Sequence, residues 1–130
     1  MRLLLDTHAW IWWTTADPRL AESAVAVIAD PANTVSFSAA SAWEIAIKHA
    51  LGKLPLPLAP RVYVPTRLAA QGFTTLPVTV EHALAVTALP VHHKDPFDRM
   101  LIAQASVEGL TVVTSDPLFA PYGVATLSAL

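Results

Sequence analysis

The chain has 130 residues, which is enough for one ordinary domain with a hydrophobic core. Apolar residues make up 54% and charged residues 14%, which excludes a disordered tail. The absence of cysteine excludes disulfides, thiolate zinc sites and cysteine nucleophiles. A net charge of −2 excludes nucleic-acid binding through a bulk positive field, so any nucleic acid must be held by a local patch or through a metal ion.

A mean hydropathy of +0.48 raises the question of a membrane span. The sequence has no uninterrupted apolar stretch of about 18 residues, the length that a spanning helix needs. Only three apolar residues separate Arg2 from Asp6, too few for the core of a signal peptide. We therefore expect a soluble, cytoplasmic domain.

The first half of the chain alternates short apolar runs with helical segments. Asp17 followed by Pro18 is typical of a helix start, and Gly52 is typical of the position just after a helix. The pattern predicts strands at 3–5 and 35–37 and helices over 8–15, 18–29 and 39–51.

The second half repeats this alternation after a proline-rich loop at 55–60. Asp95 and Pro96 are typical of a helix start, while Gly72 and Gly109 mark helix ends. Strands that alternate with helices indicate an α/β domain around a mostly parallel sheet. We predict helices over 61–71, 80–89 and 96–108, and strands at 74–78 and 110–113.

Carboxylates follow two of the predicted strands. Asp6 comes directly after the first strand, and Asp116 lies close behind the last. The carboxyl ends of parallel strands share one edge, so these two can converge, with Glu44 and Asp98 on flanking helices. Four carboxylates around one crevice repel one another and favour a cation, and oxygen ligands suit Mg²⁺ or Mn²⁺. The set therefore suggests a metal-dependent phosphodiesterase.

Each acid also has a structural explanation. Asp6 and Asp116 could simply cap the segments that follow them. Glu44 forms an i,i+4 pair with Lys48 of the kind found on exposed helix faces. Asp98 falls in a first helical turn, where an acid stabilises the helix dipole.

Histidine and tryptophan offer weaker signals. His92 and His93, beside Lys94, could be metal ligands, RNA contacts or loop residues. We expect loop residues, because adjacent side chains do not easily converge on one ion. His8 is expected to pack or hydrogen-bond near the acids. Tryptophans at helical spacing are more typical of a core or an interface than of base stacking, and this applies to Trp10, Trp12, Trp13 and Trp43.

Four segments, in order and in register along nearly the whole chain, resemble PIN-domain ribonucleases, specifically the VapC-type toxins of bacterial toxin–antitoxin pairs. Each segment alone is weak, but the four together are specific. They are Leu3-Leu4-Leu5-Asp6-Thr7-His8, the run from Ser36 to Lys48, the run from Asp95 to Ala105, and Thr114-Ser115-Asp116.

The resemblance implies a single PIN domain over 1–130, with a three-layer fold in which a sheet of four to five short strands is flanked by helices. It also implies Mg²⁺- or Mn²⁺-dependent endonucleolytic cleavage of RNA by a metal-bound water. The catalytic and metal-binding positions would be Asp6, Glu44, Asp98 and Asp116. Thr7 and Ser115 match polar positions that help to place the metal, and Asp95 is either a helix cap or an outer-shell ligand.

The resemblance further implies a homodimer and a cognate VapB-type antitoxin that blocks the site. The proline-rich region from Pro55 to Pro65 is a candidate for partner contacts. The chain has few basic residues with which to hold RNA, and Lys48, Lys94 and Arg99 are the candidates near the acids.

Other functions fit the same acids less well. A catalytically silent PIN-like module that binds RNA or protein stays open, although all four acids are present. A phosphoacceptor domain would need a lysine after a late strand, and the last lysine is Lys94. An aspartyl phosphatase would have a second aspartate where this chain has His8. A nuclease acting on DNA or flaps is disfavoured by the small size and the lack of a basic arch.

Overall fold

The computed structural model describes residues 1–130 and confirms the predicted α/β architecture. Five parallel strands form one sheet in the order β3-β2-β1-β4-β5, so that β1 lies in the middle. All the carboxyl ends of the strands therefore point to the same edge. The strands are β1 (Arg2–Leu5), β2 (Thr34–Ser38), β3 (Thr74–Leu76), β4 (Thr111–Thr114) and β5 (Thr126–Ser128).

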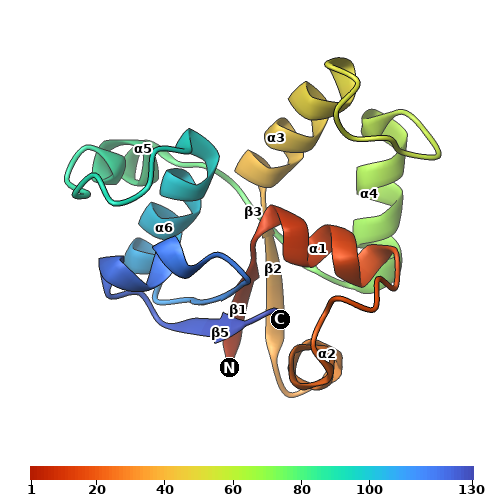
Figure 1. Cartoon of the computed structure of the whole chain (residues 1–130), viewed down its shortest axis with the longest axis horizontal. Coiled ribbons are helices and arrows are strands. Elements are labelled where there is room, and N and C mark those ends of the chain that lie inside the picture. Colours follow the sequence, from red (N-terminus) through yellow and green to blue (C-terminus); the bar gives the residue numbers. More distant parts are fainter.

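Helices cover both faces of the sheet and complete three layers. Figure 1 shows α5 and α6 on one side and α1, α2 and α4 on the other, with α3 rising from the end of β2. Their bounds are α1 (Thr7–Thr14), α2 (Glu22–Ala29), α3 (Ala39–Ala50), α4 (Pro60–Gln71), α5 (Val80–Val86) and α6 (Pro96–Glu108), followed by the 3₁₀ helix η1 (Pro117–Tyr122).

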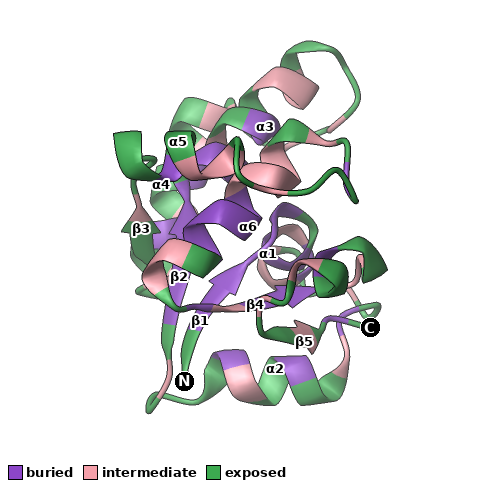
Figure 2. Cartoon of the chain, turned by 90° about the vertical axis from the view of Figure 1, so that its left-hand side faces the viewer, coloured by how far each residue is buried: buried purple, intermediate pink, exposed green.

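The central strand β1 is buried on both faces, which explains its continuous run of leucines. Leu3 and Leu5 pack into a cluster with residues of α1, α2, α3 and α4. Leu4 points the other way, into a second cluster that includes residues of α6 and Phe119 of η1. Figure 2 shows the buried strands between helices whose outer faces are exposed. The two clusters hold β1, and with it Asp6, at a fixed place.

Two predicted helices are shorter in the structure. The helix predicted over 18–29 begins at Glu22, because Asp17 binds the backbone N–H and the guanidinium of Arg19 in a turn. The helix predicted over 80–89 ends at Val86, whose carbonyl accepts a hydrogen bond from Arg99. In both cases a side chain takes a partner outside the helix and stabilises a turn instead.

Other boundaries differ by a few residues, and two elements were not predicted. Strand β3 stops at Leu76 because Pro77 has no N–H for the ladder. The 3₁₀ helix η1 and the three-residue strand β5 have no sequence periodicity that would reveal them. The observed number of strands, five, lies within the predicted range of four to five.

None of the helices has the length and apolar character needed to cross a membrane.

Candidate active site

The four predicted acids reach one edge of the sheet from four different elements. Asp6 follows β1, and Asp116 follows β4, the neighbour of β1. Glu44 lies in the second turn of α3, which starts directly after β2, and Asp98 lies in the first turn of α6. The parallel sheet thus gathers residues more than 100 positions apart, as the ends of parallel strands predict.

Asp6 is buried, with an exposed fraction of 4%. Its Oδ1 accepts a hydrogen bond from the backbone N–H of Ala9 at 2.8 Å and thereby caps α1. Burial raises the pKa of Asp6, and the hydrogen bonds from the Thr114 hydroxyl and from Ala9 only partly oppose this shift. Asp6 is therefore both a helix cap and a member of the acid cluster.

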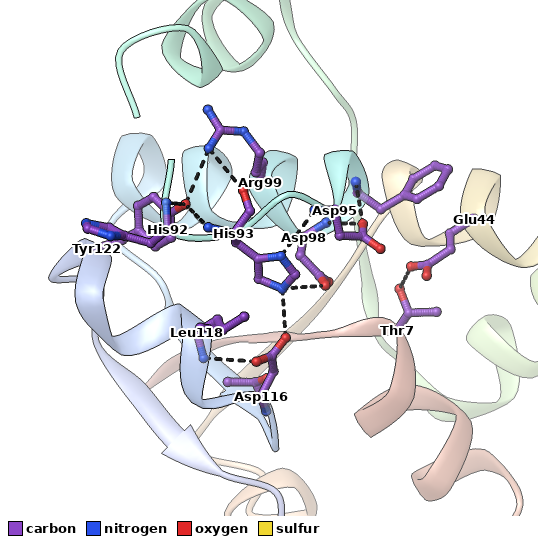
Figure 3. Close-up of polar contacts among 12 residues, drawn as sticks. Thr7, Glu44, His92, His93, Asp95, Asp98, Arg99, Asp116, Leu118 and Tyr122 are labelled. Atoms are coloured by element: carbon purple, nitrogen blue, oxygen red, sulfur yellow. Dashed lines mark hydrogen bonds and ion pairs between the residues drawn. The ribbon is translucent and has the colours of Figure 1, made fainter. Parts of the chain in front are cut away.

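Glu44 is also buried, at 3% exposed, although it forms the i,i+4 pair with Lys48. Its Oε1 accepts a hydrogen bond from the Thr7 hydroxyl at 2.6 Å (Figure 3), and Thr7 Oγ1 lies 2.9 Å from Ser41 Oγ. The other oxygen, Oε2, binds the Lys48 ammonium. This pair therefore differs from the exposed helix pairs that resemble it in sequence, because the carboxylate faces the interior.

Asp98 carries the clearest electrostatic signal of the site. Its pKa is raised to about 7, first by burial and then by the nearby carboxylates of Asp95, Glu44 and Asp6. The imidazole of His93 opposes this shift. Capping of a helix dipole would lower an aspartate pKa, so the dipole explanation does not account for Asp98. Its environment is that of one acid among several.

Asp95 is the N-cap of α6. Its Oδ1 accepts hydrogen bonds from the N–H groups of Phe97 at 2.8 Å and of Asp98 at 3.1 Å. Its charge nevertheless contributes to the raised pKa of Asp98 and to the raised pKa of Lys48, for which the Glu44 hydrogen bond is the largest cause. The capping role of Asp95 is therefore visible, and its carboxylate lies close to the cluster.

His93 joins the acids, contrary to the expectation that it is a simple loop residue. It is buried, and its Nε2 lies 2.7 Å from Asp116 Oδ2 and 3.0 Å from Asp98 Oδ2 (Figure 3). His92, its neighbour, is exposed and packs its ring edgewise on Tyr122. Adjacent residues do diverge, as expected, but one of the two points into the site. Only the conformation of the loop at 87–95 determines which of the two histidines points into the site.

Arg99, predicted as a candidate for holding RNA, has intramolecular partners in the structure. Its guanidinium donates to the carbonyls of Val86, Leu89, Pro90 and His93, at 3.0–3.3 Å, and thereby fastens the loop before α6. A cation with this many backbone partners is a structural clamp.

The two predicted lysines, Lys94 and Lys48, differ in their surroundings. Lys94 is exposed beside a cavity of about 660 Å³ that is lined largely by apolar residues. Lys48 lies against Glu44 and borders a smaller hollow with Thr7 and the exposed His8. His8 has no hydrogen-bonded partner, but its charge lowers the pKa of Asp6, which agrees with its expected place near the acids.

Two further residues around the site, Thr114 and Gln104, were not predicted. Thr114 Oγ1 accepts from the N–H of Asp116 at 3.0 Å, and the Thr114 hydroxyl lowers the pKa of Asp6 against the larger effect of burial. Ser115 lies beside Asp116 in a shallow hollow and has no side-chain hydrogen bond. Gln104, fully buried, accepts from Ser38 Oγ at 2.6 Å and links α6 to the start of α3. A glutamine among the apolar residues of a helix was the available signal for Gln104.

The tryptophans divide between core and surface. Trp10 and Trp12 are buried, and Trp13 is partly buried against Phe73. Trp43 is 65% exposed and packs edgewise on Phe97 at 5.3 Å, at the rim of the apolar cavity. The first three therefore stabilise the fold, and Trp43 forms part of an exposed apolar surface.

The donor set fits a hard divalent cation. The cluster presents carboxylate oxygens from Asp6, Glu44, Asp98 and Asp116 and contains no sulfur ligand. The oxygens of Asp98 and Asp116 lie within 4.8 Å of each other and of His93 Nε2. A bound cation would relieve the repulsion that raises the pKa of Asp98. The cluster could therefore bind a metal ion.

Comparison with known proteins finds a ribonuclease among the relatives of this chain. The chain is 50% identical over 70 residues to ribonuclease VapC16 of Mycobacterium tuberculosis, a match that covers 51% of this chain and 48% of that protein. The matched segment thus spans about half the length of this relative.

Two solved structures share the fold. VapBC2 from Rickettsia felis, bound to a DNA fragment from their promoter, gives a TM-score of 0.73 at 14% identity over 98% of each chain. DNA-bound VapBC from Salmonella typhimurium gives 0.72 at 17% identity over 100% of this chain and 99% of that one. The family model of the PIN domain matches residues 3–124, and the chain therefore belongs to the PIN domain family.

Proposed function

We propose that this chain is a VapC-type endoribonuclease toxin that hydrolyses phosphodiester bonds in cellular RNA with Mg²⁺ or Mn²⁺. The observation that carries the proposal is the convergence of Asp6, Glu44, Asp98 and Asp116 at one edge of the sheet, where burial and then the charges of Asp95, Glu44 and Asp6 raise the pKa of Asp98 to about 7. The half-length match to ribonuclease VapC16 supports the same activity.

Four carboxylates would hold the cation, namely Asp6, Glu44, Asp98 and Asp116. When bound, Mg²⁺ or Mn²⁺ lowers the pKa of water and stabilises negative charge on a phosphoryl oxygen. Residues of the chain orient these carboxylates. Thr7 fixes the Glu44 carboxylate, and the N–H of Ala9 fixes that of Asp6. Fixed ligands lower the cost of assembling the reacting groups.

The substrate is held near the acids by few cations. Lys48 and Lys94 are the predicted residues that stay free of backbone partners, and Lys53 borders the hollow beside Lys48. We infer that these lysines contact phosphates of single-stranded or looped RNA. Because only a few lysines neutralise phosphates at this patch, binding should weaken with salt by a shallow slope.

We infer a homodimer and a VapB-type antitoxin as partners. The two solved structures compared above are VapBC structures. The largely apolar cavity that Trp43 and Val78 line suits a protein partner, and both of these side chains are exposed. The proline-rich region is a second candidate, since Leu58 and Val62 are exposed there.

The test is cleavage of a mixed RNA substrate by purified protein with Mg²⁺, with Mn²⁺, and with chelator. We expect cleavage by the wild type only with added metal. Asp98→Asn should abolish it. Asp30→Asn is the matched control, because it removes the same charge from an exposed aspartate in the loop before β2.

Absence of cleavage by the wild type, with partner binding intact, would favour the catalytically silent alternative. Cleavage that survives chelator or Asp98→Asn would exclude the proposed role of the acids.

A further inference from the structure

His93 is held more firmly than its place in a loop suggests. Its backbone N–H donates to the Tyr122 hydroxyl at 2.7 Å, and its carbonyl accepts from the Arg99 guanidinium at 3.3 Å. Its ring packs edgewise on Phe119, with centroids 6.0 Å apart. Because backbone and ring are both fixed, the imidazole has little freedom to turn away from the acids.

The hydrogen bonds determine which ring nitrogen carries the proton. The backbone N–H of Asp95 donates to His93 Nδ1 at 3.1 Å, so Nδ1 must present a lone pair. The proton of the neutral ring therefore sits on Nε2. That nitrogen faces Asp116 Oδ2 at 2.7 Å and Asp98 Oδ2 at 3.0 Å (Figure 3). His93 thus donates to these carboxylates.

A nitrogen that carries a proton has no lone pair for a metal ion. Although His93, Asp98 and Asp116 lie close enough to share one ion, the imidazole would first have to lose its bond from Asp95. The remaining contact of the Asp116 carboxylate is Oδ1 with the N–H of Leu118 at 2.9 Å. Donors of this kind, placed behind ligating carboxylates, are known to fix their orientation.

We propose that His93 is a positioning residue that holds Asp98 and Asp116 together through its Nε2–H and orients them for the divalent cation without binding the cation itself. The inference rests on the proposed function, because it concerns the same metal site. Metal affinity would then depend on His93 as well as on the four acids.

The chain contains a second histidine with the same arrangement. His82 is fully buried, its Nδ1 accepts from the N–H of Thr79 at 3.1 Å, and its Nε2 lies 2.8 Å from Glu108 Oε1. Glu108 ends α6, at the opposite end of that helix from Asp98. His82 therefore shares the burial and the hydrogen bonding of His93 but has no acid cluster beside it, which makes it a matched control.

The experiment measures Mn²⁺ binding by calorimetry in the wild type and in His93→Ala, His93→Gln and His82→Ala, with thermal unfolding of each. We expect His93→Ala to weaken Mn²⁺ binding by about 10- to 100-fold. His93→Gln offers an amide N–H near the position of Nε2 and should keep affinity within a few-fold. His82→Ala should lower the unfolding temperature and leave Mn²⁺ affinity unchanged.

Pulsed electron paramagnetic resonance of Mn²⁺ bound to the wild type gives an independent readout that needs no variant. We expect no coupling from a directly bound nitrogen. A directly bound nitrogen would make His93 a ligand and overturn the inference.

The calorimetry has three further outcomes that would overturn the inference. Unchanged affinity in His93→Ala would do so and leave the proposed metal site standing. Equal losses in His93→Ala and His93→Gln would show that the N–H donor is not what matters. A wild type that does not bind Mn²⁺ would remove the metal site, and the inference with it.

Discussion

Asp6 and Glu44 are buried side chains, whereas Asp98 and Asp116 are partly exposed at the same edge. The buried pair is held by neutral donors and one lysine from α1, α3 and β4. The partly exposed pair is joined by His93, which comes from the loop before α6. One half of the site thus depends on regular elements, and the other depends on a loop that Arg99 fastens.

The difference shows that strands and loops position different acids of the site. Pairing between parallel strands fixes the position of each strand's carboxyl end at the sheet edge. Asp6, directly after β1, therefore needs little further support. The side chains of Asp98 and Asp116 are themselves partly exposed, and the His93 ring contacts both. Changes in the two halves should therefore have different effects on stability and on metal binding.

The largest effect is expected from Asp6→Asn. Loss of a ligand should lower metal-dependent cleavage by at least about 100-fold, since loss of an outer-shell partner alone costs up to that much. The free energy of unfolding of the metal-free protein at pH 7.5 should rise, because burial raises the pKa of Asp6 and asparagine carries no charge. Chemical denaturation and an RNA cleavage assay check the two parts. A loss of stability would show that the Asp6 charge is compensated in the folded protein.

Arg99→Ala should affect the half of the site that contains Asp98 and Asp116. The change leaves several carbonyls of the 86–93 loop without their donor, and we expect a loss of about 2 kcal/mol in unfolding free energy. Mn²⁺ affinity should fall as well, because His93 loses its support. Arg99→Lys should not restore either property, since an ammonium cannot match the fork of the guanidinium. Restoration by lysine would mean that the charge alone is needed.

Asp98 and Asp6 should both make the stability depend on pH, because burial raises the pKa of each. The pKa of Asp98 is raised from 3.8 to about 7, so the folded metal-free protein binds more protons than the unfolded chain between these values. Unfolding free energy should therefore fall as the pH rises from about 4 to about 7 and level off above. Asp98→Asn should flatten this slope in denaturation series. An unchanged slope would assign the effect to another group.

Thr7→Val tests the buried half with the smallest expected effect. The change keeps the shape of the side chain but removes the hydroxyl that donates to Glu44, and we expect a loss of about 1 kcal/mol. Thr7→Ser should retain most of the stability. Thermal unfolding in the metal-free state measures both variants. Equal stability of the valine variant would show that Lys48 alone satisfies Glu44.

Much of the fold follows from local signals. Asp95, Gly72 and Gly109 mark helix boundaries because capping needs only nearby backbone groups. The same argument fails at Pro18, where Arg19 draws Asp17 into a turn instead. Strand β5 escapes prediction because it is short and partly exposed at the edge of the sheet, and so has no apolar pattern.

The sequence by itself determined the α/β order and the four acids, since strand ends, caps and apolar runs are encoded within a few residues of one another. Only the tertiary structure decided that His93 points at Asp98 and Asp116, that Thr114 lies beside Asp6, and that Arg99 faces a loop. Hydrogen bonds between distant segments depend on how those segments pack, and no local pattern records the direction of a side chain.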